Sequence, residues 1–111
     1  MEQISFQVQG SSATPYLVTF HRNGMNLNAS CTCAAGQNGQ YCKHRISILV
    51  DNSKEGIVSE NIDQVAIVHS WLAGTDVEMA LEELVAAEQR LESAKREVSS
   101  IKKRVAQAFK A

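Results

Sequence analysis

The N-terminal part of the chain alternates apolar and polar residues in three stretches. Residues 4–9, 16–22 and 25–29 follow the period of two that places one face of a strand against a core. Between the last two stretches, Asn23-Gly24 is a strong signal for a two-residue hairpin of type I′, whose central residues both need positive φ. The pattern therefore predicts a three-stranded antiparallel meander.

Two further segments carry apolar residues at helical spacing. These segments are residues 45–51 and residues 59–73. Their apolar positions are Ile46, Leu49 and Val50 in the first segment, and Ile62, Val65, Ala66 and Leu72 in the second. Residues 65–68 are apolar on all sides, so a short buried strand is an alternative there. Trp71 is expected in the core or as a lid over the sheet, rather than in a binding site.

A long helix is predicted over residues 76–109, which contain neither glycine nor proline. Thr75 and Glu78 form a capping box at its start. At about 1.5 Å per residue the helix would be roughly 50 Å long, so it must project or pair. Its apolar residues repeat in heptads, which we call the seam: Val77, Ala80, Leu84, Ala87, Leu91, Ala94, Val98, Ile101, Val105 and Ala108.

Charge divides this helix into two halves. Residues 76–92 carry six acidic side chains against Arg90, and residues 95–111 carry six basic side chains against Glu97. This distribution complements the helix macrodipole, which accounts for part of it. An antiparallel pair of helices would also set acidic halves against basic ones, whereas a parallel pair would oppose like charges. We therefore expect an antiparallel homodimer; the alternatives are a helix that folds back or pairs with a different protein.

The middle of the chain contains a candidate metal site. Cys31, Cys33, Cys42 and His44 include every cysteine of the protein, and three thiolates with one imidazole are a usual donor set for structural zinc. In extended backbone, residues two apart point to one side, so Cys31 with Cys33 and Cys42 with His44 would form two ligand pairs joined by a turning loop. Core cysteines, a disulfide and an iron–sulfur centre are weaker alternatives.

The run CTCAAGQNGQYCKHRISILV resembles the SWIM zinc finger, whose signature is Cys-x-Cys, a variable loop and Cys-x-His, leading into an apolar helix. The resemblance covers about residues 16–51. It implies that Cys31, Cys33, Cys42 and His44 hold one structural Zn²⁺ ion. It also implies a binding role towards DNA or protein. The loop lacks the proline that many members carry near the first ligand pair.

The expected fold class is α+β. A zinc-finger head over residues 1–73 would contain the small meander and the following helices, and residues 75–109 would form the coiled-coil-like helix. A head of this size buries little surface. A structural zinc ion contributes on the order of 10 kcal/mol of apparent free energy coupled to folding. Chelation is therefore expected to unfold the head.

The sequence favours a binding module over an enzyme, because four protein donors fill the metal's positions and no catalytic motif is present. The main hypothesis is a dimeric protein–protein adaptor, and the alternative is a small DNA-binding accessory factor. The formal net charge of −1 gives no general bias towards DNA. The candidate contacts to DNA or to a protein partner are five basic residues: Lys43, Arg45, Lys102, Lys103 and Arg104. No secretory signal or membrane span is predicted, which suggests a cytoplasmic or nuclear protein.

Overall fold

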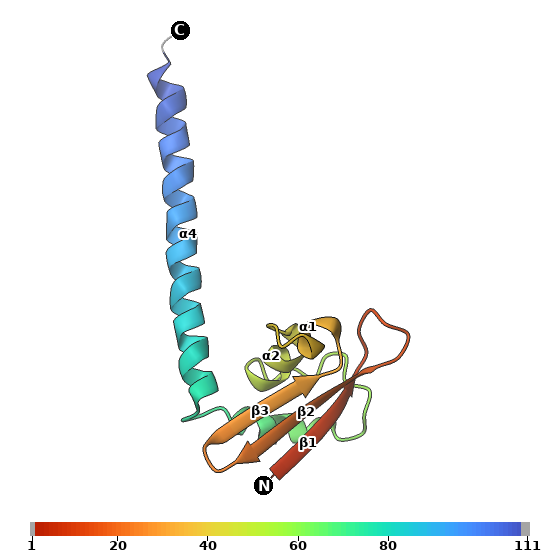
Figure 1. The fold of residues 1–111 in the computed structure, drawn as a ribbon. Helices are drawn as coiled ribbons and strands as arrows, with labels where there is room; N and C mark the ends of the chain where they lie inside the picture. The colour runs from red at the N-terminus through yellow and green to blue at the C-terminus, as the bar shows by residue number, and fades with distance from the viewer. Residues whose placement is uncertain (1, 110–111) are drawn as a thin grey trace. The chain divides into compact units, whose positions relative to one another are not determined.

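The computed structural model describes residues 2–109. Its N-terminal part is a three-stranded antiparallel sheet in the order β1-β2-β3, with β1 at Glu2–Val8, β2 at Tyr16–Asn23 and β3 at Asn26–Cys31 (Figure 1). This confirms the predicted meander. Together with the helices that follow, it gives the expected α+β fold.

The turn between β2 and β3 differs from the predicted type. Asn23 pairs with Asn26, so the central residues of the turn are Gly24 and Met25 rather than Asn23 and Gly24. Gly24 has φ of +61°, and among residues 2–109 the one non-glycine residue with positive φ is Asn52. Positive φ at the first central position alone is the pattern of a type II′ turn. The Asn-Gly signal thus located the hairpin but was shifted by one residue.

Alternation along the strands places the core on one face of the sheet. Phe6 and Phe20 are fully buried there, and their rings meet edge to face with centroids 6.1 Å apart. The other face is polar, and the Ser5 and Thr19 hydroxyls lie 2.9 Å apart on it. The helices of the head cover this apolar face, because packing there removes Phe6, Phe20 and Val18 from water.

Two short helices follow the sheet, and both differ from the predicted bounds. Helix α1, Ala34–Gln37, occupies part of the segment expected as a turning loop. Helix α2, Lys43–Leu49, begins two residues earlier than predicted, so that His44 lies within it. Leu49 is buried as predicted, but its buried neighbour is Ile48, whereas Ile46 and Val50 are half-buried. The face of α2 that meets the core is therefore rotated from the predicted one.

The predicted helix over residues 59–73 is shorter in the structure. It consists of a 3₁₀ turn η1, Ile62–Gln64, and helix α3, Val65–Ser70. Val65, Val68 and Trp71 form its buried face, so the strand alternative is wrong and Trp71 is in the core as expected. Ile62 and Ala66 are exposed, contrary to prediction, because only residues three apart along this short helix face the core of the head.

The outer edge of β1 is covered by a segment without a sequence signal. Ile57 forms a bridge with Val8, the Gln9 N–H donates to the Gly56 carbonyl at 2.8 Å, and the Val58 N–H donates to the Gln7 carbonyl at 2.8 Å. These bonds satisfy backbone groups that an open edge would leave unpaired. The head therefore extends past α2 and includes this return segment.

The C-terminal helix α4 spans Asp76–Ala108, 33 residues, and none of its side chains is buried. Contacts divide the chain between Glu78 and Met79. The predicted capping box is present with one change. The Glu78 N–H donates to the Thr75 hydroxyl at 3.3 Å, but the Glu78 carboxylate accepts from the Gly74 N–H at 3.1 Å rather than from Thr75.

The described residues end before the end of the predicted basic half of the helix. Lys110 and Ala111, which belong to the predicted basic half, lie outside the described residues. Within residues 2–109, no helix has an apolar stretch long enough to cross a membrane.

Candidate metal centre

The four candidate ligands come from a strand end and two helix starts. Cys31 is the last residue of β3, and Cys33 is the residue that caps α1. Cys42 caps α2, and His44 lies in the first turn of that helix. The prediction of an extended ligand pair is confirmed for Cys31 and Cys33, which lie in the strand and in extended backbone after it. It is wrong for the second pair, because Cys42 is extended but His44 lies in helix α2.

The donor atoms of these residues converge. All lie within 4.8 Å of one another. The Sγ atoms of Cys33 and Cys42 are 3.4 Å apart, and the Nδ1 atom of His44 lies 3.8 Å from the Cys31 Sγ and 3.6 Å from the Cys42 Sγ. Tetrahedral zinc with ordinary bond lengths requires donor separations of about 3.8 Å between sulfurs and about 3.6 Å between sulfur and nitrogen.

The three cysteines are free, and the 3.4 Å separation of the closest sulfurs is far longer than the roughly 2.05 Å of a disulfide. Cys31, Cys33 and Cys42 are all buried, while His44 is half-buried. Clustered buried thiols beside an imidazole nitrogen are the arrangement that a metal ion requires. The residues present therefore fit one tetrahedral zinc ion.

Backbone N–H groups donate to the sulfurs from the α1 segment. The Cys33 N–H lies 3.5 Å from the Cys31 Sγ, and the Gly36 N–H lies 3.3 Å from the Cys33 Sγ. Such bonds stabilise a thiolate and fix its position. Gly36 is required for this approach, because a Cβ atom at that position would collide with the Cys31 carbonyl oxygen and would lie 2.8 Å from the Cys31 Cβ.

The thiols differ in their ease of ionisation. Burial raises the pKa of Cys31 to about 12. Burial also acts to raise the pKa of Cys42, but hydrogen bonds from the Arg45 backbone N–H, Cys33 and His44 outweigh it and lower the pKa of Cys42 to about 6. Cys42 is therefore the first of these two thiols to become a thiolate. Because zinc binds thiolates, loading the site must release the proton that Cys31 keeps.

His44 presents its Nδ1 atom to the sulfurs, which leaves Nε2 to carry the proton when the site is loaded. Its ring lies against Tyr16, with centroids 4.9 Å apart and an angle of 43° between the planes. Tyr16 thus restricts the orientation of the ligand. The sequence pattern gave no signal for this role, because Tyr16 occurs simply as the first apolar residue of a strand.

Arg45, a predicted contact to DNA or a partner, bonds within the head. Its guanidinium donates to the Ala29 carbonyl at 3.1 Å and to the Gln40 carbonyl. These bonds connect α2 to β3 and to the segment that precedes α2. Lys43, in contrast, is exposed beside the site. The other predicted cations, Lys102, Lys103 and Arg104, are exposed consecutive residues of α4.

The segment of the sequence that carries these ligands matches a known family. The SWIM zinc finger model matches residues 20–51. The match runs from β2 through the end of α2 and contains all four ligands, which confirms the resemblance noted from the sequence. Searches of curated proteins and of solved structures found no match. The SWIM finger is a zinc-binding module, and the donor cluster supports one structural Zn²⁺ ion.

The match leaves out part of the head. Strand β1, the return segment around Ile57 and helix α3 all lie outside residues 20–51. These elements supply Phe6, Val65 and Trp71, which are buried against the finger. In this chain the SWIM finger is therefore built into a larger core.

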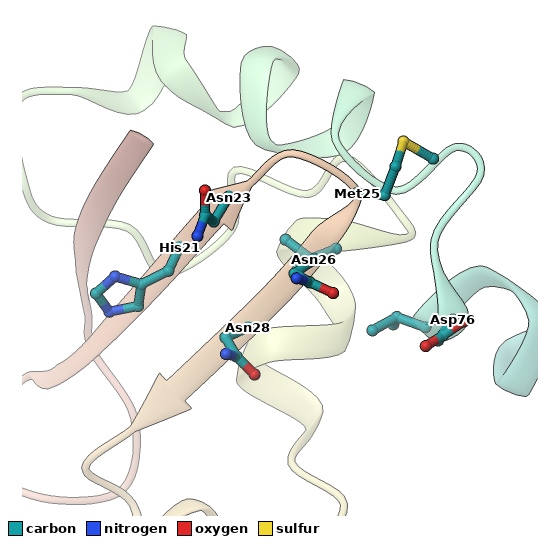
Figure 2. A pocket seen from close by; sticks show the side chains of 8 residues that line it. His21, Asn23, Met25, Asn26, Asn28 and Asp76 are labelled. Carbon is teal, nitrogen blue, oxygen red and sulfur yellow. The ribbon is translucent and has the colours of Figure 1, made fainter. Parts of the chain in front are cut away.

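A concave region lies at the hairpin end of the sheet (Figure 2). It has a volume of about 670 Å³ and is lined mainly by polar residues: His21, Asn23, Met25, Asn26, Leu27, Asn28, Asp76 and Val77. Figure 2 shows His21 and Asp76 at opposite sides of this hollow, with Asn28 between them. Among the described residues, no hydrogen bond or ion pair joins these two titratable side chains.

Proposed function

We propose that the protein is a dimeric protein–protein adaptor, in which the SWIM finger is a structural head and α4 is the dimerisation element. The observation that carries the proposal is the exposure of the apolar seam. Leu91 is 56 % exposed and Val105 is 53 % exposed, and no residue of α4 is buried. An apolar stripe at heptad spacing on a long helix is the pattern of a helix that pairs with another helix.

The chemistry of the metal site supports a structural role. Three cysteines and one histidine supply four donors within 4.8 Å, which completes the tetrahedral set that structural zinc sites use. Catalytic zinc sites instead keep one position for water or substrate. The zinc would hold β3, α1 and α2 together, and the function of the head would be binding rather than catalysis.

The seam available to a partner starts beyond the first predicted residue. Val77 is half-buried and packs against the core of the head. The remaining seam runs from Ala80 to Ala108. Its charge distribution favours an antiparallel homodimer, because the acidic N-terminal half of one copy would lie beside the basic C-terminal half of the other.

Self-association is tested by measuring the mass of the zinc-loaded full chain by light scattering over a range of concentrations. We expect twice the chain mass of 12.2 kDa. Leu91→Glu should give the monomer, because it places a charge in the seam. Val85→Glu is the matched control, since Val85 is 54 % exposed but lies off the seam. A monomeric wild-type protein, or equal effects of the two substitutions, would contradict the proposal.

DNA binding is the alternative that the same protein sample can test. The exposed Lys102, Lys103 and Arg104 favour it, while the bonds of Arg45 to Ala29 and Gln40 weaken it. Fluorescence anisotropy with a labelled duplex should show no tight binding at about 50 mM salt. Binding that is tight there and falls steeply with salt would favour the DNA-binding function instead.

A further inference from the structure

Beyond Val77, four charged residues flank the seam of α4 at intervals of seven. They are Glu83, Arg90, Glu97 and Arg104, and their signs alternate along the helix. Each directly precedes a seam residue, which places all of them along one border of the apolar stripe. This alternation goes beyond the division into acidic and basic halves and is not required by the helix macrodipole.

These charges have no partner in their own helix. Residues three and four positions away are the neighbours that a helical charge can reach. For Arg90 these are Ala86, Ala87, Ser93 and Ala94, and the other three charges likewise have only uncharged residues there. Within residues 2–109, the ion pair that forms is Glu2 with Arg22, in the sheet. The flanking charges of α4 are thus available to another molecule.

We infer that α4 binds a second copy of itself in one antiparallel register, with the two-fold axis between Glu92 and Ser93. The inference rests on the proposed antiparallel dimer and adds the alignment of its two helices. The seam consists of two series of residues spaced by seven, one that begins at Val77 and one that begins at Ala80. In antiparallel pairing, residues of one series lie against residues of the other series on the partner helix. The register then forms these layers, each repeated by symmetry: Leu91 on the partner's Ala94, Ala87 on the partner's Val98, Leu84 on the partner's Ile101, and Ala80 on the partner's Val105.

The packing of this register is complementary in size. In every layer except Leu84 with the partner's Ile101, a bulky side chain meets an alanine. Alternation of large and small residues allows the helices to approach closely, towards the lower end of the roughly 8–10 Å range of interaxial distances. The exposed apolar residues of the seam would then be covered along its length.

The charges select this register. Arg90 lies opposite the partner's Glu97, and Glu83 lies opposite the partner's Arg104, with both pairs repeated by symmetry. On the other border, Glu88 lies opposite the partner's Lys95. Every one of these cross-helix pairs is attractive, so the four flanking charges that are unpaired in the single chain all acquire partners.

Other alignments lose this complementarity. A shift of one heptad in one direction sets Arg90 opposite the partner's Arg90 and Glu83 opposite the partner's Glu97. The opposite shift sets Arg90 opposite the partner's Arg104 and Glu97 opposite its own copy. Like charges at such positions are destabilising, and the alternating signs therefore disfavour both neighbouring antiparallel registers.

A parallel pair also opposes like charges. It would set Glu83 against the partner's Glu88 and Arg90 against the partner's Lys95. Only Glu97 would face an opposite charge, on the partner's Lys102. Arg104 would face the uncharged Phe109 of the partner subunit. A charge reversal at Arg90 should consequently weaken an antiparallel dimer and strengthen a parallel one.

The test is a charge exchange in the zinc-loaded full chain. Arg90→Glu replaces two attractive pairs by two repulsive ones in the inferred dimer, and should weaken self-association by about tenfold or more, measured by sedimentation. Arg96→Glu is the matched control, because it makes the same change of charge on the face opposite the seam. It should shift the dissociation constant by less than about threefold.

Complementation sharpens the test. Glu97→Arg alone should weaken association as Arg90→Glu does, because each variant paired with itself sets like charges opposite one another. An equimolar mixture of the two variants should form a heterodimer of wild-type affinity. In this heterodimer, the new carboxylate at position 90 faces the new guanidinium at position 97, and the native charges at these two positions face each other at the symmetry-related site.

The mixture is followed by sedimentation with a fluorescent label on one variant, so that the heterodimer is distinguished from either homodimer. Zinc content and Trp71 fluorescence should remain unchanged in every variant, which excludes loss of the head as a cause of weaker association.

The outcomes separate the inference from the proposed function. A wild-type chain that stays monomeric overturns both. A dimer that Arg90→Glu strengthens is parallel, because the new carboxylate would face the partner's Lys95. A dimer that responds equally to Arg90→Glu and Arg96→Glu retains the adaptor proposal but overturns the register. The register is supported if Arg90→Glu weakens self-association, Arg96→Glu does not, and the mixture of Arg90→Glu with Glu97→Arg recovers wild-type affinity.

Discussion

In the head, Phe6, Phe20 and Val65 are fully buried, whereas in α4 no side chain is buried. The head directs its apolar residues inward and its donor atoms towards a common centre. The helix leaves its apolar seam exposed, and its flanking charges form no ion pair within residues 2–109. The head thus holds the four donors of a structural zinc site, and the helix presents an exposed apolar seam that the proposed dimer would cover.

The two regions should also differ in what stabilises them. Small domains bury a low fraction of their surface, so the free energy supplied by zinc, on the order of 10 kcal/mol, is comparable with the whole stability of a domain. An isolated helix in water gains little from propensity alone, and most helical stability in proteins comes from packing of an apolar face. Removal of zinc and disruption of the seam should therefore act on separate parts of the chain.

The largest expected effect is that of chelation. Removing zinc leaves three buried thiols without the ion that holds them, and the head should lose its cooperative unfolding transition. Trp71, the one tryptophan of the chain, is 5 % exposed, so its emission should shift to longer wavelength. Circular dichroism should retain much of its helical signal, because α4 would stay paired.

Readdition of Zn²⁺ is the control, and it should restore the Trp71 emission. Magnesium at the same concentration should not, because thiolates favour zinc over a hard cation. An unfolding transition that is the same with and without chelator in a metal-depleted sample would show that the core of the head suffices without the ion.

The next effect concerns Gly36, in the segment between the ligand pairs. Gly36→Ala adds a Cβ atom that collides with the Cys31 carbonyl oxygen, and backbone must move to accommodate it. Overpacking of this kind costs roughly 1–3 kcal/mol. The displacement would also disturb the N–H bond to the Cys33 sulfur. Competition with a chromophoric chelator should show weaker zinc retention, together with a lower melting temperature of the head.

Gly39→Asn is the matched control within the same segment. Gly39 has φ of +68° and no atom near the position of an added Cβ, and asparagine tolerates this backbone conformation better than other side chains. It should retain zinc nearly as the wild type does. Equal zinc loss in the two variants would mean that any change in this segment disturbs the site, and that the contact of Gly36 with Cys31 is not the cause.

The regular parts of the fold could be predicted from the sequence because their signals are local. The period of two located β1, β2 and β3, and the heptads located α4 to within a residue. The identity of the four clustered donors was also predictable, since Cys31, Cys33, Cys42 and His44 are close in sequence. Their detailed geometry was not, because α1 formed in the predicted loop and α2 began before His44, where the spacing suggested extended backbone.

Contacts between segments that are distant in the sequence could not be predicted from local patterns. Ile57 covers the edge of β1 through bonds to residues at the start of the chain, and no periodic pattern marks it. Arg45 was predicted as a surface contact because it lies beside a ligand, yet its guanidinium bonds to Ala29. An arginine in sequence does not reveal whether its donors meet solvent or a backbone carbonyl, since that depends on where the chain returns.

The smallest of these effects lies at Thr75, where the head ends and α4 begins. The Thr75 hydroxyl donates to the Leu72 carbonyl at 2.7 Å and accepts from the Glu78 N–H at 3.3 Å, and Thr75 is buried. Thr75→Ala removes both bonds and should cost about 1 kcal/mol, as for other N-caps. Amide hydrogen exchange should become faster in the first turn of α4 and stay unchanged near Leu91.

Thr75→Ser keeps the hydroxyl and should retain slow exchange in that turn, which separates loss of the cap from loss of the buried methyl group. If the cap acts only locally, zinc retention and self-association of Thr75→Ala should both match the wild type. Faster exchange along the whole of α4 would instead mean that the cap sets the stability of the entire helix. The helix would then depend on the head as well as on its partner, and the contrast between the two regions would be weaker than their burial suggests.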